Sequence, residues 1–204
     1  MINNTNFTGS KNAKIYPQKI YHKSLVDNNF ADVEFTGQFD GCNIIGSDFT
    51  GSTGAIIDPT TLFDKRLEGT KLNGVVFDGP FNDVSICGSD FMGSTGSIIN
   101  PQTVKDRDLS CVNCCDVDFI GPFDGANICG ANFTGSKGAE INPQTILDKN
   151  LENTICSDVW FIGSFDDVKM NNGTVLEGSN YEEFVPSEDI FREKLKQLIK
   201  NRKQ

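Results

Sequence analysis

Large apolar side chains recur at every fifth position through most of the chain. Neither regular element has this period, because an amphipathic helix repeats about every 3.6 residues and a half-buried strand every second residue. A period of five predicts a chain that turns a corner after each short extended step and points one large side chain inward per step. The clearest run of such positions is Phe39, Ile44, Phe49, Ile57, Leu62, Leu67, Leu72, Phe77 and Phe81.

A longer repeat of 42 residues contains the five-residue one. Phe7, Phe49, Phe91 and Phe133 keep this spacing, and the segments around them are similar. Two irregular steps recur in the units, one of eight residues after Phe49 and one of four residues after Phe77. Each unit still holds eight inward positions, which predicts two four-step coils per 42-residue unit.

A small residue stands two positions before many of the large apolar ones, and the resulting pentapeptides include ANFTG, SDFTG, TNFTG, CNIIG and ANICG. These stretches resemble the pentapeptide-repeat protein family, whose motif is a small residue, Asp or Asn, a large apolar centre and two turn residues. The resemblance covers residues 2–184. It implies an all-β solenoid, namely a right-handed quadrilateral β-helix of about nine coils, which forms one domain over residues 1–184.

An Asx-Pro pair follows the eight-residue step in three units, as Asp58-Pro59, Asn100-Pro101 and Asn142-Pro143. Asx at the cap and Pro at the first position are typical of a helix start. We therefore expect residues 58–66 and their equivalents to leave the regular path as a corner excursion with a short helical turn. The charged residues Lys65, Arg107 and Lys149 favour this interpretation, because a regular path would point them inward, where an unpaired charge is costly.

The last residues have a different pattern. Residues 187–204 begin with Ser187 as a helix cap, carry acids early and bases late, and place Phe191, Leu195 and Leu198 at helical spacing. We predict an amphipathic α-helix that either caps the last coil or, as in some members of the family that the chain resembles, forms a homodimer. A solenoid needs such protection of its ends.

Acidic residues outnumber basic ones by 28 to 18, and the resulting net charge of −10 argues against direct binding of nucleic acid. Four equivalent windows, residues 30–41, 72–83, 114–125 and 156–167, hold acids and no Lys or Arg. Stacked coils would align them as a candidate acidic interaction stripe. Its members are Asp32, Glu34, Asp40, Asp78, Asp83, Asp116, Asp118, Asp124, Asp158, Asp166 and Asp167.

Two explanations of these acids stay open. A subset of the pentapeptide-repeat family imitates DNA and occupies the DNA groove of type II topoisomerases, so the resemblance implies DNA gyrase as one partner, with quinolone resistance as the effect. An acidic rod would attract a basic channel as phosphates do. Alternatively, Asp is common at turns because its carboxylate bonds local backbone N–H groups.

The residues that support catalysis are scarce. The single His22 excludes a two-His metal site and leaves little choice for a His-dependent triad. Cys111, Cys114 and Cys115 contain one CxxC without a second pair, and the five-residue period points Cys114 into the core above Cys156. We expect no catalytic residue, no metal site and no cofactor.

The remaining expectations concern thiols, contacts and location. An odd count of seven Cys favours reduced thiols, and Cys87 and Cys129 lie two coils apart, about 10 Å, which is too far for a disulfide. Trp160 should face solvent as a candidate contact residue. No signal peptide or membrane span is evident, so we expect a cytoplasmic protein. The sequence favours a non-catalytic structural or protein-interaction scaffold with an unknown protein partner.

Overall fold

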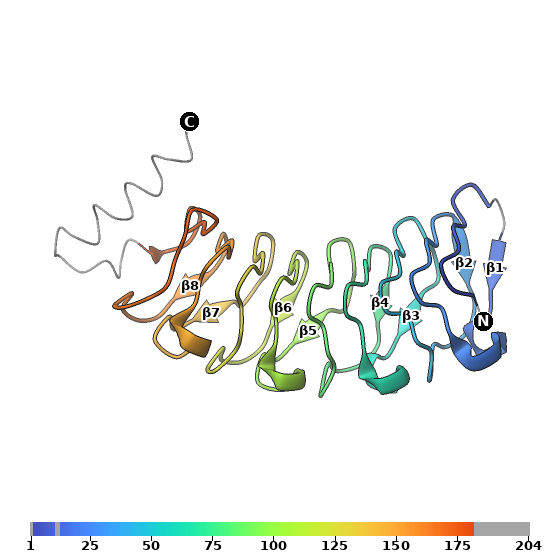
Figure 1. Ribbon diagram of the computed structural model, residues 1–204, viewed down its shortest axis with the longest axis horizontal. Helices are drawn as coiled ribbons and strands as arrows, with labels where there is room; N and C mark the ends of the chain where they lie inside the picture. The colour runs from blue at the N-terminus through green and yellow to red at the C-terminus, as the bar shows by residue number, and fades with distance from the viewer. Residues whose placement is uncertain (1, 11–12, 182–204) are drawn as a thin grey trace.

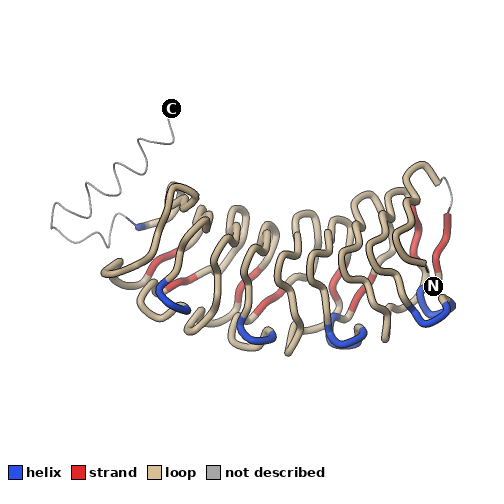
Figure 2. The backbone as a smooth tube through the Cα atoms, viewed as in Figure 1, coloured by secondary structure: helices blue, strands red, loops and turns tan. Residues whose placement is uncertain are grey.

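The computed structural model describes residues 2–10 and 13–181, which form a row of stacked coils running from the N-terminal to the C-terminal end (Figure 1). Most of each coil is turn and loop, with short strands on one face and short 3₁₀ helices along an adjoining edge (Figure 2). The strands are β1 Ala13–Ile15, β2 Val33–Phe35, β3 Ile56–Ile57, β4 Val76–Phe77, β5 Ile98–Ile99, β6 Asp118–Phe119, β7 Glu140–Ile141 and β8 Trp160–Phe161. The 3₁₀ helices are η1 Pro17–Lys19, η2 Tyr21–Lys23, η3 Pro59–Thr61, η4 Phe63–Lys65, η5 Lys105–Arg107 and η6 Leu147–Lys149.

Parallel backbone pairing joins each coil to the next. The strands form the two-stranded parallel sheets β1-β2, β3-β4, β5-β6 and β7-β8. A second ladder of single bridges links Asn29 to Asp48, Asp48 to Lys71 and Lys71 to Asp90. Two successive steps of this ladder cover the 42 residues of the sequence repeat. The parallel pairing of successive turns of the chain agrees with the predicted solenoid.

The interior consists of the large side chains at the five-residue positions. Phe49, Phe91 and Phe133 have no exposed surface, and the inward residues on both sides of the irregular steps are also buried. The ring of Phe49 lies 5.1 Å from that of Phe30 and 5.4 Å from that of Phe35, measured between centroids. Each fully buried Phe stabilises the fold by about 1.5–3 kcal/mol through removal of apolar surface from water. The stacked rings thus tie neighbouring coils together.

The predicted corner excursion is present, and its helical turn is of the 3₁₀ type. The Asp58 carboxylate caps η3 by accepting a hydrogen bond of 2.9 Å from the Thr60 backbone N–H. η4 follows directly, and Lys65 at its end has a positive φ of 50°. This backbone turns the ammonium group outward, where it lies 3.3 Å from the Asp83 carboxylate. The excursion therefore keeps the charge out of the core.

Glycine is required within the eight-residue step that follows Phe49 and its equivalents. Gly54 has a φ of +71°, and a Cβ atom there would stand 2.5 Å from the backbone oxygen of Phe35 in the preceding coil. Gly96 and Gly138 face the oxygens of Phe77 and Phe119 in the same way. Only glycine allows this close approach of two backbones together with a left-handed conformation.

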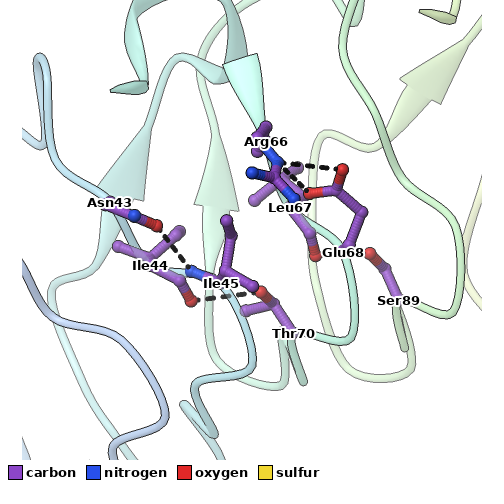
Figure 3. Close-up of polar contacts among 8 residues, drawn as sticks. All are labelled: Asn43, Ile44, Ile45, Arg66, Leu67, Glu68, Thr70 and Ser89. Carbon is purple, nitrogen blue, oxygen red and sulfur yellow. Dashed lines mark hydrogen bonds and ion pairs between the residues drawn. The ribbon is translucent and has the colours of Figure 1, made fainter. Parts of the chain in front are cut away.

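Small polar residues two positions before the inward ones bond to the backbone inside the solenoid. The Thr70 hydroxyl donates to the Ile44 carbonyl oxygen at 3.2 Å, and the Ser89 hydroxyl donates to the Leu67 carbonyl oxygen at 2.7 Å (Figure 3). These bonds satisfy hydroxyl groups that burial would otherwise leave without a partner. They also connect coils, because each donor and acceptor lie in neighbouring turns of the chain.

One serine position departs from this pattern. Within the part of the chain that the structure describes, the buried hydroxyls of Ser52 and Ser136 have no hydrogen-bond partner. The equivalent Ser94 hydroxyl lies 2.7 Å from the hydroxyl of Ser97. Alanine occupies the place of Ser97 in the other two units, so the partner is missing there because of a single residue difference.

The predicted C-terminal helix over residues 187–204, with Phe191, Leu195 and Leu198, lies outside the described residues. Its capping or dimerising role stays a prediction.

Candidate interaction surface

The eleven acids of the expected stripe occupy three kinds of position in the coils. The first group, Asp32, Asp116 and Asp158, occupies turns. The second group lies on or directly after the strands and comprises Glu34, Asp78 and Asp118. The third group lies beside the 3₁₀ edge and comprises Asp40, Asp83, Asp124, Asp166 and Asp167. All are exposed except Asp40, which is half-buried. The members of each group recur at similar positions of successive 42-residue units.

The turn group has a structural task. Each member has a φ between 65° and 67°. The Asp32 carboxylate accepts a hydrogen bond from the Gly9 N–H at 3.0 Å, and Asp116 accepts the equivalent bond from Gly93 at 2.9 Å. Asp158 accepts from Gly135 at 2.9 Å. These three carboxylates therefore stabilise the turn of the preceding coil, as the turn explanation of the acids requires.

Lysines from neighbouring coils lie beside two of the strand acids. The Lys14 ammonium group is 2.9 Å from the Glu34 carboxylate, and the Lys137 ammonium group is 3.8 Å from the Asp118 carboxylate. The hydrogen bond with Glu34, followed by its charge, raises the pKa of Lys14. These pairs are exposed and contribute little to stability. They do, however, reduce the negative potential of the strand side.

In the third group, glutamine side chains from the preceding coil bond to the backbone rather than to the carboxylates. The Gln102 side-chain amide donates to the carbonyl oxygens of Pro122 at 3.1 Å and of Asp124 at 2.8 Å. Gln144 makes the same pair of bonds to Ser164 and Asp166. This clamp fixes the corner without using a carboxylate. We call this group, Asp40, Asp83, Asp124, Asp166 and Asp167, the corner acids.

The strands present a second kind of surface. Trp160 is the one member of it that the sequence indicated as a contact residue. The outward side chains of β3 and β4, Ile56 and Val76, are directly paired in register and are 51% and 44% exposed. Ile98 on β5 is similarly exposed, and Trp160 on β8 is 53% exposed. We call the outward strand residues and their neighbours the strand face. Its apolar members are Ile56, Val76, Ile98, Ile120, Trp160 and Ile162.

A signal for this surface exists in the sequence. Ile56-Ile57 and Ile98-Ile99 are apolar doublets at positions where the period requires one inward side chain. Because successive side chains of a strand point to opposite faces, the first member of each doublet has to face outward. The five-residue pattern alone draws attention only to the inward member.

The thiols divide into buried and outward ones, as the period predicts. Cys42, Cys114 and Cys156 are buried, and all seven cysteines are free. Burial raises the pKa of Cys42 to about 11 and raises the pKa of Cys114 and Cys156 further. Inert, protonated thiols of this kind pack as small apolar groups. Cys87 and Cys129 are half-buried at the surface.

Two further features of the described residues concern metal binding and membrane insertion. Within residues 2–10 and 13–181, no group of three or more His, Cys, Asp or Glu side chains is arranged to hold a metal ion. In the same part of the chain, no helix has the length and apolar character that crossing a membrane requires.

Comparison with known proteins gives structural matches alone. No family model matches the chain, and no curated protein matches its sequence. The chain is similar to trypsin-treated QnrB1, a plasmid-mediated fluoroquinolone resistance protein, with 16% identity, a TM-score of 0.30 and coverage of 84% of this chain and 93% of that one. Full-length QnrB1 is similar with 13% identity and a TM-score of 0.28, and that match covers 95% of this chain and 96% of QnrB1.

HetL, a pentapeptide repeat protein involved in heterocyst differentiation regulation from the cyanobacterium Nostoc sp. strain PCC 7120, is similar with 13% identity and a TM-score of 0.24. That match covers 87% of this chain and 83% of HetL. Identities and TM-scores in this range carry no argument about function, so the pentapeptide-repeat family remains a resemblance seen in the sequence.

Proposed function

We propose that this protein is a non-catalytic, rigid scaffold that binds another protein through its strand face. The observation that carries the proposal is the in-register pair of Ile56 and Val76 on adjacent coils, both half exposed although large and apolar. Exposed apolar side chains that gather on one surface are typical of protein interaction sites, whereas scattered ones are ordinary. Trp160 adds the residue type that contributes most to binding energy at such sites.

The backbone below these side chains favours binding without rearrangement. Val76 is bridged to Ile56 on one side and to Thr95 on the other, so its strand is hydrogen-bonded along both edges. A side chain held on a fixed backbone loses less conformational entropy on binding than one on a free loop. The partner is a protein with an apolar contact surface, because Ile56, Val76 and Ile98 present large apolar side chains to solvent on three consecutive strands.

Photocrosslinking tests this proposal and identifies the partner in the same experiment. A photoreactive amino acid placed at Val76 should give a discrete crosslinked adduct in cells, and mass spectrometry would identify the protein attached. The same amino acid at Met92, which is 51% exposed outside the strand face, is the matched control. Equal adducts from both positions, or none from Val76, would refute the strand face as the binding surface.

The corner acids favour one alternative function, the imitation of DNA toward a basic channel such as that of DNA gyrase. These acids recur from unit to unit, and the glutamine clamp bonds to their backbone rather than to their carboxylates. Lys65 beside Asp83 and the lysines on the strand side weaken the one-signed field that this function needs. Supercoiling by purified gyrase, with and without the protein, separates the two functions; no inhibition at micromolar protein would eliminate the DNA mimic.

The finer architectural predictions belong to the same proposal. The scaffold is a right-handed quadrilateral β-helix of about nine coils, works in the cytoplasm, and carries an amphipathic helix over residues 187–204 that either caps the last coil or forms a homodimer. Size-exclusion chromatography of the full chain and of a chain ending at residue 186 distinguishes the two roles of this helix. A halved mass on truncation indicates a dimerising helix, and an unchanged monomeric mass indicates a cap.

A further inference from the structure

One corner of the solenoid repeats a left-handed turn position in successive coils. Glycine occupies this position at Gly46, Gly69, Gly88 and Gly130, with φ between 64° and 72°. Cys111 takes the same position in the coil between Gly88 and Gly130, with a φ of 57°. Residues other than Gly, Asn and Asp are unfavourable in this left-handed conformation. Backbone geometry therefore does not explain the cysteine, and a strained residue of this kind points to a role for its side chain.

The neighbouring coil brings a second thiol next to Cys111. The backbone N–H of Cys111 donates to the backbone oxygen of Cys129 at 3.0 Å. The Sγ atom of Cys111 lies 3.2 Å from the place where a Cβ atom on Gly130 would be, so it extends toward the coil that contains Cys129. Coils about 4.8 Å apart and residues about 3.8 Å apart along the chain put the two Cα atoms about 6 Å from each other, within the range that a disulfide spans.

Cys87 is the competing partner, because it lies diagonally to Cys111 in the preceding coil. Its Sγ atom contacts the Ser110 hydroxyl at 3.2 Å, whereas the Cys111 sulfur extends in the opposite direction, toward Gly130. The Cys129 thiol donates to the Glu152 backbone oxygen at 3.3 Å and has to rotate about its side-chain bond to reach Cys111. The direction of the Cys111 sulfur therefore favours Cys129 over Cys87 as its partner.

We propose that Cys111 and Cys129 form a site of reversible oxidation, in which exchange with a low-molecular-weight disulfide such as oxidised glutathione links two adjacent coils. The exposed Cys111 thiolate attacks the small disulfide, forms a mixed disulfide and releases one glutathione thiolate. The Cys129 thiolate then attacks the Cys111 sulfur and releases the second glutathione thiolate. Two protein thiols are oxidised, one glutathione disulfide is reduced to two thiols, and the two protons pass to solvent or to the departing thiolates.

The order of the two steps follows from the surroundings of the thiols. Burial, then the neighbouring Cys111 and Glu152, raises the pKa of Cys129. Cys129 is therefore the slower thiol toward a reagent from solvent and acts as the resolving thiol once Cys111 carries the glutathione. The product closes a loop from residue 111 to residue 129 and prevents these two coils from separating locally.

Peptide mapping of the folded full-length protein tests the proposal. After incubation with oxidised glutathione, a proteolytic digest should contain the Cys111–Cys129 linked peptides, the chain should lose two free thiols, and dithiothreitol should reverse both changes. The oxidised protein should also melt at a higher temperature than the reduced protein. Cys111→Gly, which introduces the residue of the two adjacent coils, and Cys129→Ser should both abolish the link.

Two variants serve as matched controls. Cys87→Ser removes the competing thiol, and Cys115→Ser removes a half-buried thiol at a different corner; both should retain the link. Circular dichroism confirms that each variant is folded. A Cys87–Cys111 link, a link between chains, a mixed disulfide that does not resolve, or an unchanged thiol count would each overturn the proposal.

Discussion

Replacing Phe91 with alanine tests the claim that stacked side chains inside the solenoid hold it together. Phe91 has no exposed surface, and its ring centroid lies 5.7 Å from that of Phe77 and 5.6 Å from that of Phe81. Removing a buried phenyl ring loses its transfer free energy and leaves a cavity that rigid neighbouring coils fill poorly. We expect the free energy of unfolding to fall by about 4 kcal/mol, a large part of the stability of a typical domain.

The neighbouring residue supplies the control. Met92 follows Phe91 directly but is 51% exposed, so Met92→Ala should change the free energy of unfolding by less than about 0.5 kcal/mol. Equilibrium unfolding in urea, followed by far-UV circular dichroism, measures both values, and an unchanged m value shows that the same unfolding transition is compared. A loss below about 1.5 kcal/mol for Phe91→Ala, or equal losses for both variants, would refute the reasoning.

Three further predictions concern polar and surface positions. Ala139→Ser should give the buried Ser136 hydroxyl the partner that its equivalent already has and raise the free energy of unfolding by about 1 kcal/mol; a loss in urea unfolding would show that the site lacks room. Burial raises the pKa of Asp48, but hydrogen bonds from Thr50 and Lys71 lower it by more. The ionised Asp48 therefore stabilises the fold above the unfolded pKa of about 3.9, and this stabilisation is lost as pH falls through the lower folded pKa. Lys71→Met should flatten this acid limb of the stability–pH curve, and an unchanged limb would contradict the pairing. Trp160→Ala should leave the melting temperature nearly unchanged and reduce the yield of the adduct from the strand-face crosslinker, whereas a large loss of stability would make Trp160 a packing residue.

The local sequence determined the course of the chain within a coil. The five-residue period identified the inward residues, such as Phe49 and Phe133. Each step needs one large apolar side chain for the core, and this requirement is visible directly in the sequence. The Asx-Pro pairs indicated local turns, since both residues act on the backbone next to them: Asp58-Pro59 starts a 3₁₀ helix, whereas Asn100-Pro101 and Asn142-Pro143 start ordinary turns. The 42-residue repeat was evident for the same reason, because the inward positions and the two irregular steps recur in the units.

Contacts between coils needed the tertiary structure. The period assigned Lys65 an inward position that only an excursion could avoid, and the observed positive φ of a residue other than glycine turns its charge outward toward Asp83. The expected acidic stripe is divided among turns, strands and a corner, and Cys111 lies beside Cys129 rather than beside the other thiols of its own motif. Residues of this kind meet because the coils are about 4.8 Å apart in space, although many residues separate them along the chain. The inward repeat constrains one side chain per step and leaves the outward ones free, so stacking of the coils decides which of them become neighbours.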